Sequence, residues 1–342
     1  MDNTKDFSIK LGWNPVAEAI RRGWINFFPR LFGMMLWRRN VLYKIVLFLV
    51  LITLQLGACQ PATNIPKNTS TPPSPNLIVP SILKETVTFV FKPLPQDPEE
   101  KVIPNGTGFF VGVEDKLHPG RSYVYLVTAK HVIQEKGNYF PFIAVRLNKK
   151  SGGADVMKIP LIGEGARTVY VHKEPDVDLA VIPLAPQSDI YDYKYWGYSW
   201  SKVLTEKERI KQENITSGDE VFFIGLLWQL FIDPSMYRKK NIPIVKFGRV
   251  AAETEEKIPV KEEDDIVKLL DLYLIEAQAI GGNSGSPVFI HTRGGTTLLA
   301  GILTGHYIDR KENAGIAYVI PAYKLSEILF SDELKDMRGE GH

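Results

Sequence analysis

From residue 81 onwards, apolar and polar positions form short runs that are separated by turn residues. Runs of this length that are rich in Val, Ile, Phe and Tyr predict β-strands. Six expected strands span Thr86–Phe91, Thr107–Val113, Ser122–Thr128, Pro141–Leu147, Arg167–His172 and Asp178–Leu184. Six more span Asp219–Gly225, Ile244–Ala251, Leu270–Gln278, Ser286–His291, Thr297–Thr304 and Gly315–Ile320. Two such series without alternating helices predict an all-β chain with two β-units of similar size.

Three other segments complete this pattern. Gln187–Asn214 interrupts the strands with a cluster of Tyr and Trp at 191–200 and then a charged helical patch. The aromatic cluster either packs between the β-units or contacts a substrate or partner. The acidic run Glu253–Asp265 indicates a solvated loop. Ala322–Met337 has the apolar spacing of an amphipathic helix. We therefore expect a first β-unit at 81–185, a connection at 186–214, and a second β-unit with a C-terminal helix at 215–337.

Composition excludes several classes of function. The 342 residues are 44% hydrophobic and 23% charged, which is typical of a globular protein. A formal net charge of +2 does not suggest a nucleic-acid partner. The single cysteine excludes a disulfide framework and a tetrahedral cysteine zinc site. No phosphate-binding loop motif and no HExxH motif occur. We expect no metal and no cofactor.

The N-terminal residues 1–58 have the features of a targeting segment. Arg38 and Arg39 precede an apolar run, of which Ile45–Ala58 is uninterrupted and shorter than the roughly 20 residues that span a bilayer. The run ends at Leu56–Cys59, which resembles the lipobox of bacterial lipoproteins. In that family the cysteine is lipidated and becomes the new N-terminus, so the resemblance implies an exported, cell-envelope protein anchored through Cys59. An uncleaved single transmembrane anchor is the alternative.

The length and the charge of residues 1–58 bear on this interpretation. The stretch before Arg38 is long for a signal peptide, and a start at Met34 or Met35 would leave one of ordinary length. Cleavage before Cys59 would leave a slightly acidic mature chain, because basic residues outnumber acidic ones in 1–58. Residues 59–80 are rich in Pro, Thr, Asn and Ser, and predict a flexible tether.

The candidate chemistry lies in three separated motifs. Gly281–Pro287 is a glycine-rich turn that could expose the hydroxyl of Ser284 and two backbone N–H groups. A serine hydroxyl needs a neighbouring imidazole as base, and that imidazole needs a carboxylate. His131 follows an expected strand, and Asp178 enters an apolar one, where an acid is rarely placed without a partner. Asp176 is the competing acid, in a loop position typical of a solvated turn.

These motifs resemble those of trypsin-like serine peptidases, closest to the bacterial Deg-type branch. Thr128–Val132 is similar to the family's histidine motif, Asp178–Val181 to its aspartate motif, and Gly282–Pro287 to its serine motif. Thr107–Phe110 resembles the glycine-bearing strand that precedes the histidine. The chain order His, Asp, Ser is that of chymotrypsin-like enzymes, and the order of the α/β-hydrolases does not fit. The resemblance covers roughly residues 82–332.

The resemblance implies a fold and a set of roles. It implies two six-stranded antiparallel β-barrels, chymotrypsin-like, with a cleft between them. His131, Asp178 and Ser284 would be the catalytic triad, and the N–H groups of Gly282 and Ser284 the oxyanion hole. Gln278 would lie at the base of the primary specificity pocket, and a pocket wall would include Thr304 and His306.

The sequence also departs from the family's pattern. Ser286 replaces the usual glycine of the serine motif. No segment the size of a PDZ domain follows the terminal helix, so recognition of peptide ends is not implied. The expected function is an exported, membrane-tethered serine endopeptidase acting on proteins or peptides, without a nucleic-acid partner. A catalytically silent binding module and an esterase on the same fold are the alternatives, and the oligomeric state stays open.

Overall fold

The computed structural model describes residues 79–94, 97–198, 203, 207–226, 240–254, 256–261, 267–309, 312–335 and 338. All of them belong to Asn76–His342, one of the two units into which the chain divides. The expected leader, Cys59 and almost all of the expected tether lie outside the described residues. Among the helices that are described, none has the length and apolar character needed to cross a membrane.

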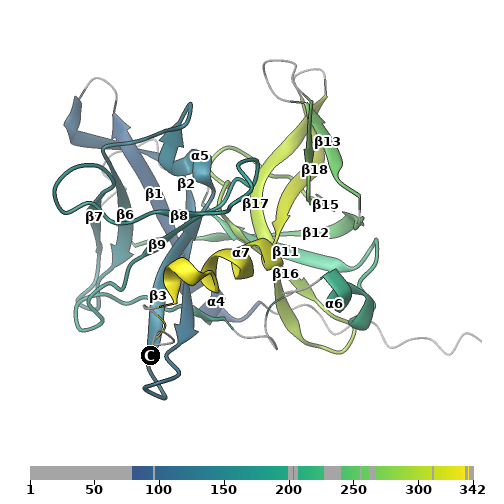
Figure 1. The fold of residues 1–342 in the computed structure, drawn as a ribbon, viewed down its shortest axis with the longest axis horizontal. Coiled ribbons are helices and arrows are strands. Elements are labelled where there is room, and N and C mark those ends of the chain that lie inside the picture. The colour runs from purple at the N-terminus through teal and green to yellow at the C-terminus, as the bar shows by residue number, and fades with distance from the viewer. Residues whose placement is uncertain are drawn as a thin grey trace, which may run out of the picture. The chain divides into compact units, whose positions relative to one another are not determined.

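The first half of this unit is one eight-stranded sheet (Figure 1). Its strands are β1 (Val87–Leu94), β2 (Asp97–Glu114), β3 (Ser122–Thr128), β6 (Phe142–Asn148), β7 (Ala154–Pro160), β8 (Tyr170–Val171), β9 (Ala180–Pro183) and β10 (Trp196–Gly197). The order is β7-β6-β1-β2-β3-β9-β8, with β10 paired to β2. A small hairpin joins β4 (Gln134–Glu135) and β5 (Asn138–Tyr139). All pairs are antiparallel except β10 with β2, which is parallel.

The second half contains a closed six-stranded antiparallel barrel. Its strands are β11 (Glu220–Gly225), β12 (Ile244–Ala252), β15 (Tyr273–Glu276), β16 (Pro287–His291), β17 (Thr297–Asp309) and β18 (Glu312–Pro321). They close in the order β11-β12-β15-β18-β17-β16. Every one of the twelve strands expected from the sequence overlaps an observed strand. The predicted all-β, chymotrypsin-like fold is therefore confirmed. Of the two six-stranded barrels expected, the second is present as a closed six-stranded barrel, whereas the strands described in the first half form an eight-stranded sheet.

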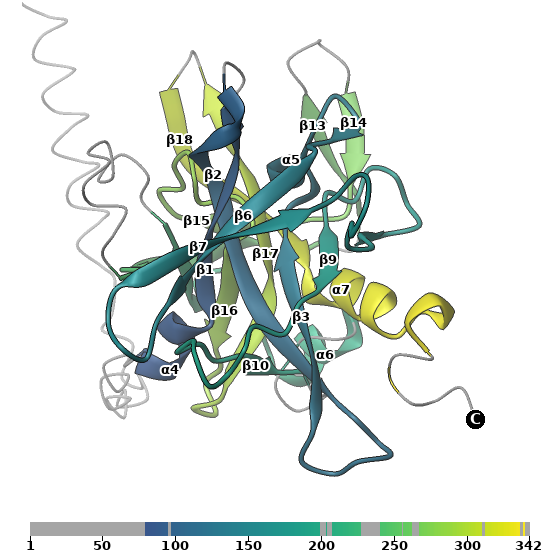
Figure 2. The same ribbon diagram turned by 90° about the vertical axis from the view of Figure 1, so that its left-hand side faces the viewer.

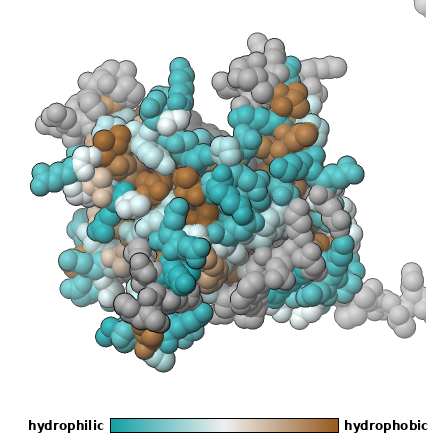
Figure 3. Space-filling view, viewed as in Figure 1, coloured by the Kyte–Doolittle hydropathy of each residue, from teal (hydrophilic) through white to brown (hydrophobic). Residues whose placement is uncertain are grey.

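Several strands were not anticipated from the pattern, namely the short β4, β5 and β10, as well as β7 and the β13–β14 hairpin. In β7 the exposure alternates from residue 156 to residue 160, but the exposed Val156 is apolar, so the sequence lacks the apolar–polar alternation that marks a half-buried strand. β13 (Ile258–Lys261), inside the expected acidic loop Glu253–Asp265, forms a hairpin with β14 (Val267–Leu270), which follows that loop. Its charged residues suggested solvated coil, but backbone pairing across the strands is compatible with exposed side chains. Val267 and Leu269 of this hairpin are exposed, and Figure 3 shows apolar surface in the region of β13 and β18.

Helices are few and short. They are α4 (Ser81–Glu85), α5 (Lys130–Ile133), α6 (Lys207–Gln212), α7 (Ala322–Leu329) and the 3₁₀ turn η4 (Asp332–Leu334). The expected C-terminal helix ends at Leu329 instead of continuing to Met337, because the backbone at Phe330 leaves the helical region (φ −107°, ψ 16°). In both views α7 lies beside β3 and β9 (Figures 1 and 2).

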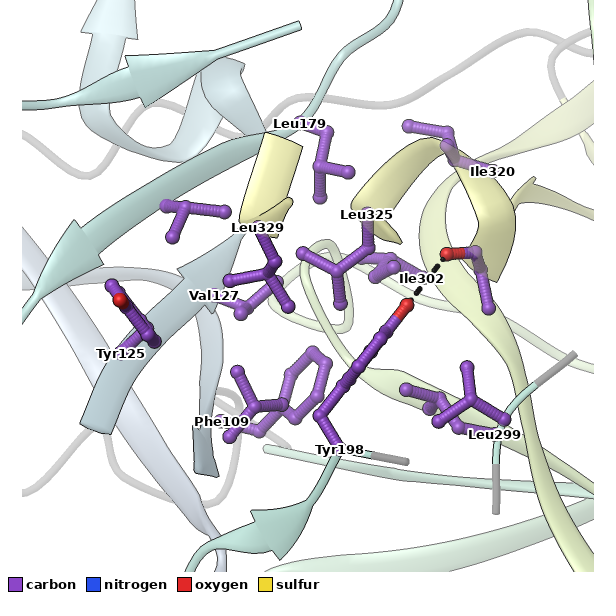
Figure 4. Packing of buried hydrophobic residues seen from close by; sticks show 14 of the residues in the cluster. Phe109, Tyr125, Val127, Leu179, Tyr198, Leu299, Ile302, Ile320, Leu325 and Leu329 are labelled. Atoms are coloured by element: carbon purple, nitrogen blue, oxygen red, sulfur yellow. Dashed lines mark hydrogen bonds between the residues drawn. The ribbon is translucent and has the colours of Figure 1, made fainter. Parts of the chain in front are cut away.

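The largest buried core lies where the two halves meet. Phe109, Val127 and Leu179 of the first half pack with residues of the second half and with Leu325 and Leu329 of α7 (Figure 4). The Tyr198 hydroxyl donates to the Ala322 carbonyl at 3.0 Å and lies 2.7 Å from Ser326 Oγ. Burial of this apolar core favours the packed arrangement of the two halves. Each Å² of apolar surface removed from water contributes roughly 25 cal/mol to the stability of the folded state.

The aromatic cluster at 191–198 takes part in this packing. Trp196 contacts Phe289 edge-on with ring centroids 5.2 Å apart, and Tyr193 lies 5.1 Å from Phe110. Tyr198 is buried in the core. Packing between the two halves is thus present for Trp196 and Tyr198, whereas Tyr193 packs within the first half and Tyr195 is 40% exposed. Trp200 lies outside the described residues.

Candidate active site

His131 and Asp178 meet at the edge of the first sheet. Thr128 ends β3, Ala129 is extended, and α5 begins at Lys130, so His131 projects from the first turn after the strand. Its Nδ1 lies 2.5 Å from Asp178 Oδ2, and its backbone N–H donates to Asp178 Oδ1 at 2.8 Å. The two carboxylate oxygens of Asp178 thus both accept hydrogen bonds from His131, one from its ring and one from its backbone. The pair has the geometry of an imidazole whose tautomer is set by an acid.

The pKa shifts of His131 and Asp178 suit an imidazole that acts as a base. Burial opposes a charge on the His131 ring, but the hydrogen bond and negative charge of Asp178 outweigh it and raise the pKa of His131 above its usual value. Burial also opposes the Asp178 anion, yet hydrogen bonds from His131 and Thr304 lower the pKa of that carboxyl. Half of the His131 side chain stays exposed, so its ring is accessible.

Asp176 lies in a different environment. Its side chain is 53% exposed and pairs with Lys268 of β14 at 3.5 Å. The side chain that faces the imidazole is that of Asp178, four residues after the start of the turn at Glu174. The competing acid therefore has the solvated role that its loop position suggests.

The Ser284 loop forms a tight turn that leaves two donors unpaired. Asn283 N–H donates to the Ile280 carbonyl at 3.0 Å, and Gly282 has φ +91°, which is the pattern of a type II turn with glycine at its third position. Within the described part of the chain, the N–H groups of Gly282 and Ser284 donate to no protein acceptor. This is the arrangement expected of an oxyanion hole.

Thr107 of β2 clamps this loop from the first half of the fold. Its hydroxyl donates to the Gly282 carbonyl at 2.7 Å, and its N–H donates to the Ser284 carbonyl at 2.8 Å. Both carbonyls of the serine turn are thereby tied to β2. The approach is so close that a Cβ on Gly285 (φ +87°) would lie 2.1 Å from the Thr107 carbonyl oxygen. The Thr-Gly pair of this motif was noticed in the sequence, but its clamping role depends on contacts across the interface.

Asn283 braces the same turn from the inside. It is 2% exposed, its Oδ1 accepts the Ile280 N–H, and its Nδ2 donates to the Leu226 carbonyl, both at 3.0 Å. A buried amide that makes two such bonds is costly to remove. Sequence reasoning missed this residue, although a polar residue next to the nucleophile was visible in the motif.

Ser284 and Thr304 connect the two halves of the site. Thr304 Oγ1 donates to Asp178 Oδ2 at 2.5 Å, and the Ser284 hydroxyl donates to the Thr304 carbonyl at 3.4 Å. Thr304 was expected only as a pocket wall, and its hydroxyl bond to the acid was not anticipated. Among the described residues no hydrogen bond joins the Ser284 hydroxyl to His131. In proteases without substrate, the bond between nucleophile and base is often long and tightens only when substrate binds.

The residues expected to form the specificity pocket lie on neighbouring segments. Gln278 is exposed, and its side-chain amide lies against Gly315, where a Cβ would come within 3.6 Å of Nε2. Thr304 and His306 are on β17, with His306 in register with Ala317 of β18. Burial lowers the pKa of His306, which favours its neutral form. These segments thus surround one short stretch of β18.

One group of side chains has the composition of a metal site. His172, Glu174 and Glu327 place one ligand atom each within 4.8 Å of one another. The ammonium of Lys324, however, lies 2.7 Å from Glu174 and 3.9 Å from Glu327. A lysine cation already balances these carboxylates, so the group does not require a metal.

With this geometry in place, the sequence can be compared with known families. Residues 106–296, more than half of the chain, match the family described as a trypsin-like peptidase domain. The chain belongs to the trypsin-like peptidase family. It is a serine-type peptidase with protein or peptide substrates. The membership expected from the three motifs is confirmed.

Solved structures of similar proteins include two proteases. The active form of the Rv3671c protease from M. tuberculosis is 18% identical, with a TM-score of 0.41 over 73% of this chain and 81% of that chain. The HtrA-type protease AlgW with tripeptide is 17% identical, with a TM-score of 0.43 over 76% of this chain. The chain spans 62% of AlgW's own length. No curated protein matches the sequence significantly.

Proposed function

We propose that this peptidase is an endopeptidase that works through a triad of His131, Asp178 and Ser284. The observation that carries the proposal is the His131–Asp178 pair, 2.5 Å apart, together with Thr304, whose hydroxyl donates to Asp178 and whose carbonyl accepts the Ser284 hydroxyl. A serine without such a base is a poor nucleophile at neutral pH.

The reaction would run in two acyl-transfer steps. Ser284 Oγ attacks the peptide carbonyl carbon while its proton passes to His131 Nε2, and the resulting oxyanion accepts bonds from the N–H groups of Gly282 and Ser284. His131 then protonates the leaving amine, which departs as the C–N bond breaks. A water molecule then gives a proton to His131 and attacks the acyl carbon. As the ester C–O bond breaks, His131 returns the proton to Ser284 Oγ, and the carboxylic acid product leaves. Asp178 stays ionised and stabilises the imidazolium in both steps.

The substrate pocket would carry no carboxylate at its base, and the ammonium of Lys246 donates to the Gln278 backbone carbonyl there at 2.6 Å. Gln278 has no charge, and the lowered pKa of His306 favours its uncharged form. A pocket with these linings offers no carboxylate to a Lys or Arg side chain, so we propose cleavage after uncharged residues.

A fluorophosphonate probe tests the triad directly, because it phosphonylates only an activated serine. Wild-type protein should be labelled, and Ser284→Ala should not be. A folded wild-type protein that is never labelled would contradict the proposal and would favour the silent binding module. Comparison of kcat/KM on peptides and on simple esters separates the endopeptidase from the esterase.

We further propose that the enzyme is exported and held at a membrane by a lipid on Cys59. The support is the motif Leu56–Cys59, which follows a basic and then an apolar run. Mass spectrometry of the mature N-terminus tests this. A lipidated N-terminal Cys59, lost in Cys59→Ala, is expected; an unmodified chain that begins before Arg38 would contradict lipidation and indicate the transmembrane alternative.

A further inference from the structure

A buried lysine of α7 lies against the turn that carries Asp178. Lys324 is in the first turn of α7, and its side chain is only 5% exposed. Its ammonium lies 2.7 Å from Glu174 Oε1. Glu174 begins a tight turn whose Val177 N–H donates to the Glu174 carbonyl at 3.1 Å, and Asp178 is the next residue. A charged hydrogen bond therefore joins the C-terminal helix to the start of this turn.

Three carboxylates surround this one ammonium. Besides Glu174 on the turn, Asp271 between β14 and β15 and Glu327 on α7 itself each lie 3.9 Å from Lys324 Nζ. Lys257 reaches the second oxygen of Glu174 at 3.7 Å. The hydrogen bond to Lys324 is the main reason that the pKa of Glu174 is lowered. Without the ammonium, the carboxylates would repel one another, and the turn would lose its main anchor.

His172 fastens the other end of the same segment. Its Nδ1 accepts the Glu174 N–H at 3.1 Å, so that nitrogen carries no proton, and Nε2 donates to Glu327 at 2.9 Å. Both ring nitrogens of this buried side chain are therefore engaged. The segment from His172 to Glu174 is held to α7 at two points.

The opposite side of the turn is held by the element that carries the base. Lys130, which precedes His131, donates from its ammonium to the Pro175 carbonyl at 2.6 Å and from its N–H to the Asp178 carbonyl at 3.3 Å. The turn thus lies between α5 and α7. A shift of the turn away from α7 would change the distance between Asp178 and His131.

We propose that Lys324 is a positioning residue that sets the place of Asp178 against His131 through Glu174. The inference rests on the proposed function, since it concerns the acid of the same triad. Lys324 touches neither substrate nor reacting atoms. Its effect would be seen in turnover and in the basicity of His131, because a displaced Asp178 supports the imidazolium less well.

The test compares Glu174→Gln, Lys324→Met and Lys324→Arg with wild type in the full chain. Glu174 is 39% exposed, so Glu174→Gln should fold even if Lys324→Met does not. We expect Glu174→Gln and Lys324→Met to lower kcat about tenfold with little change in KM, since small misplacements of catalytic groups are costly. The acid limb of the kcat/KM profile should move to lower pH, and the low-field proton resonance of His131 Nδ1 should weaken. Compared with Lys324→Met, Lys324→Arg should restore part of the kcat, of the position of the acid limb and of the His131 resonance.

Lys173→Met is the matched control. Lys173 is 80% exposed and pairs with Glu327 at 3.5 Å, so its loss removes a charge from the cluster without touching the turn. It should leave kcat and the acid limb unchanged. Folded Glu174→Gln with wild-type kcat and a wild-type acid limb would overturn the inference, as would an equal loss in Lys173→Met. A wild type that no fluorophosphonate labels overturns the proposed function and this inference with it, whereas a labelled wild type with unchanged variants overturns the inference alone.

Discussion

Thr304 donates its hydroxyl to the same Asp178 oxygen that faces His131, with both distances at 2.5 Å. The two residues belong to different halves of the fold, β17 and the turn before β9. One carboxylate oxygen therefore accepts a bond from each half. The candidate triad is complete only when both halves are folded against each other.

Replacing Thr304 tests this bond. Thr304→Val keeps the shape but leaves Asp178 Oδ2 with one donor fewer, which raises the pKa of Asp178 and weakens its hold on His131. We expect kcat/KM to fall about tenfold, since a hydrogen bond to a charged group is worth roughly 1.5–3 kcal/mol. Thr304→Ser, which retains the hydroxyl, is the control and should keep most activity. Equal activity in Thr304→Val and wild type would contradict the role of the hydroxyl.

The pH dependence follows from the raised pKa of His131. The base must be unprotonated, so kcat/KM should fall as pH decreases through that pKa. Because Asp178 raises it, the midpoint should lie above the ordinary value of about 6.5. In Asp178→Asn only burial remains, which lowers the pKa of His131, and the midpoint should move down.

A kcat/KM profile from pH 5 to 9, about the range in which histidine titrates, measures both midpoints. Asp178→Asn should also lose about 10⁴ in kcat through the wrong imidazole tautomer. Asp176→Asn is the control and should keep the wild-type profile, because Asp176 pairs with Lys268 and not with His131. A profile that responds to Asp176→Asn and not to Asp178→Asn would mean that the acid has been misassigned.

Asn283 should matter for both stability and turnover. Asn283→Ala leaves the Ile280 N–H and the Leu226 carbonyl without their partner, and a buried group left unpaired costs about 1–3 kcal/mol. The free energy of unfolding from urea titration should fall by that amount, and kcat should fall because the Gly282 turn loosens. Asn138→Ala, at an exposed position, should change neither. Unchanged unfolding in Asn283→Ala would show that the turn is held without it.

Replacing Ser286 should stabilise the protein, in contrast to replacing Asn283. Its hydroxyl is fully buried and has no hydrogen-bond partner in the described part of the chain. A buried hydroxyl without a partner costs about 1–3 kcal/mol, so Ser286→Ala should raise the free energy of unfolding by about 1 kcal/mol. The rate of fluorophosphonate labelling should stay the same. Lower stability in Ser286→Ala, measured by thermal unfolding, would indicate that the hydroxyl is satisfied.

Most strands of the fold could be predicted from the pattern of apolar residues, because these strands are buried. Runs such as Val87–Phe91 and Ser122–Thr128 are apolar enough to mark strands without any alignment. β7 and the β13–β14 hairpin were not predicted because apolar residues occupy exposed positions in them, namely Val156, Val267 and Leu269. Residue type therefore does not follow the alternation of exposure in these strands. The sequence pattern did not predict that α7 ends at Leu329, because this end depends on the backbone conformation at Phe330.

The sequence by itself determined the kinds of residue available: a serine in a glycine turn, a histidine after a strand, and an acid before one. Their chain order was enough to indicate the family. Only the tertiary structure decided which acid meets His131, which N–H groups of the Gly281–Pro287 turn stay unpaired, and how Thr304, Thr107 and Lys324 hold these parts. The physical reason is that each of these contacts joins residues far apart in the chain. Hydrogen bonds act over about 3 Å, and no local pattern records which distant segments approach so closely.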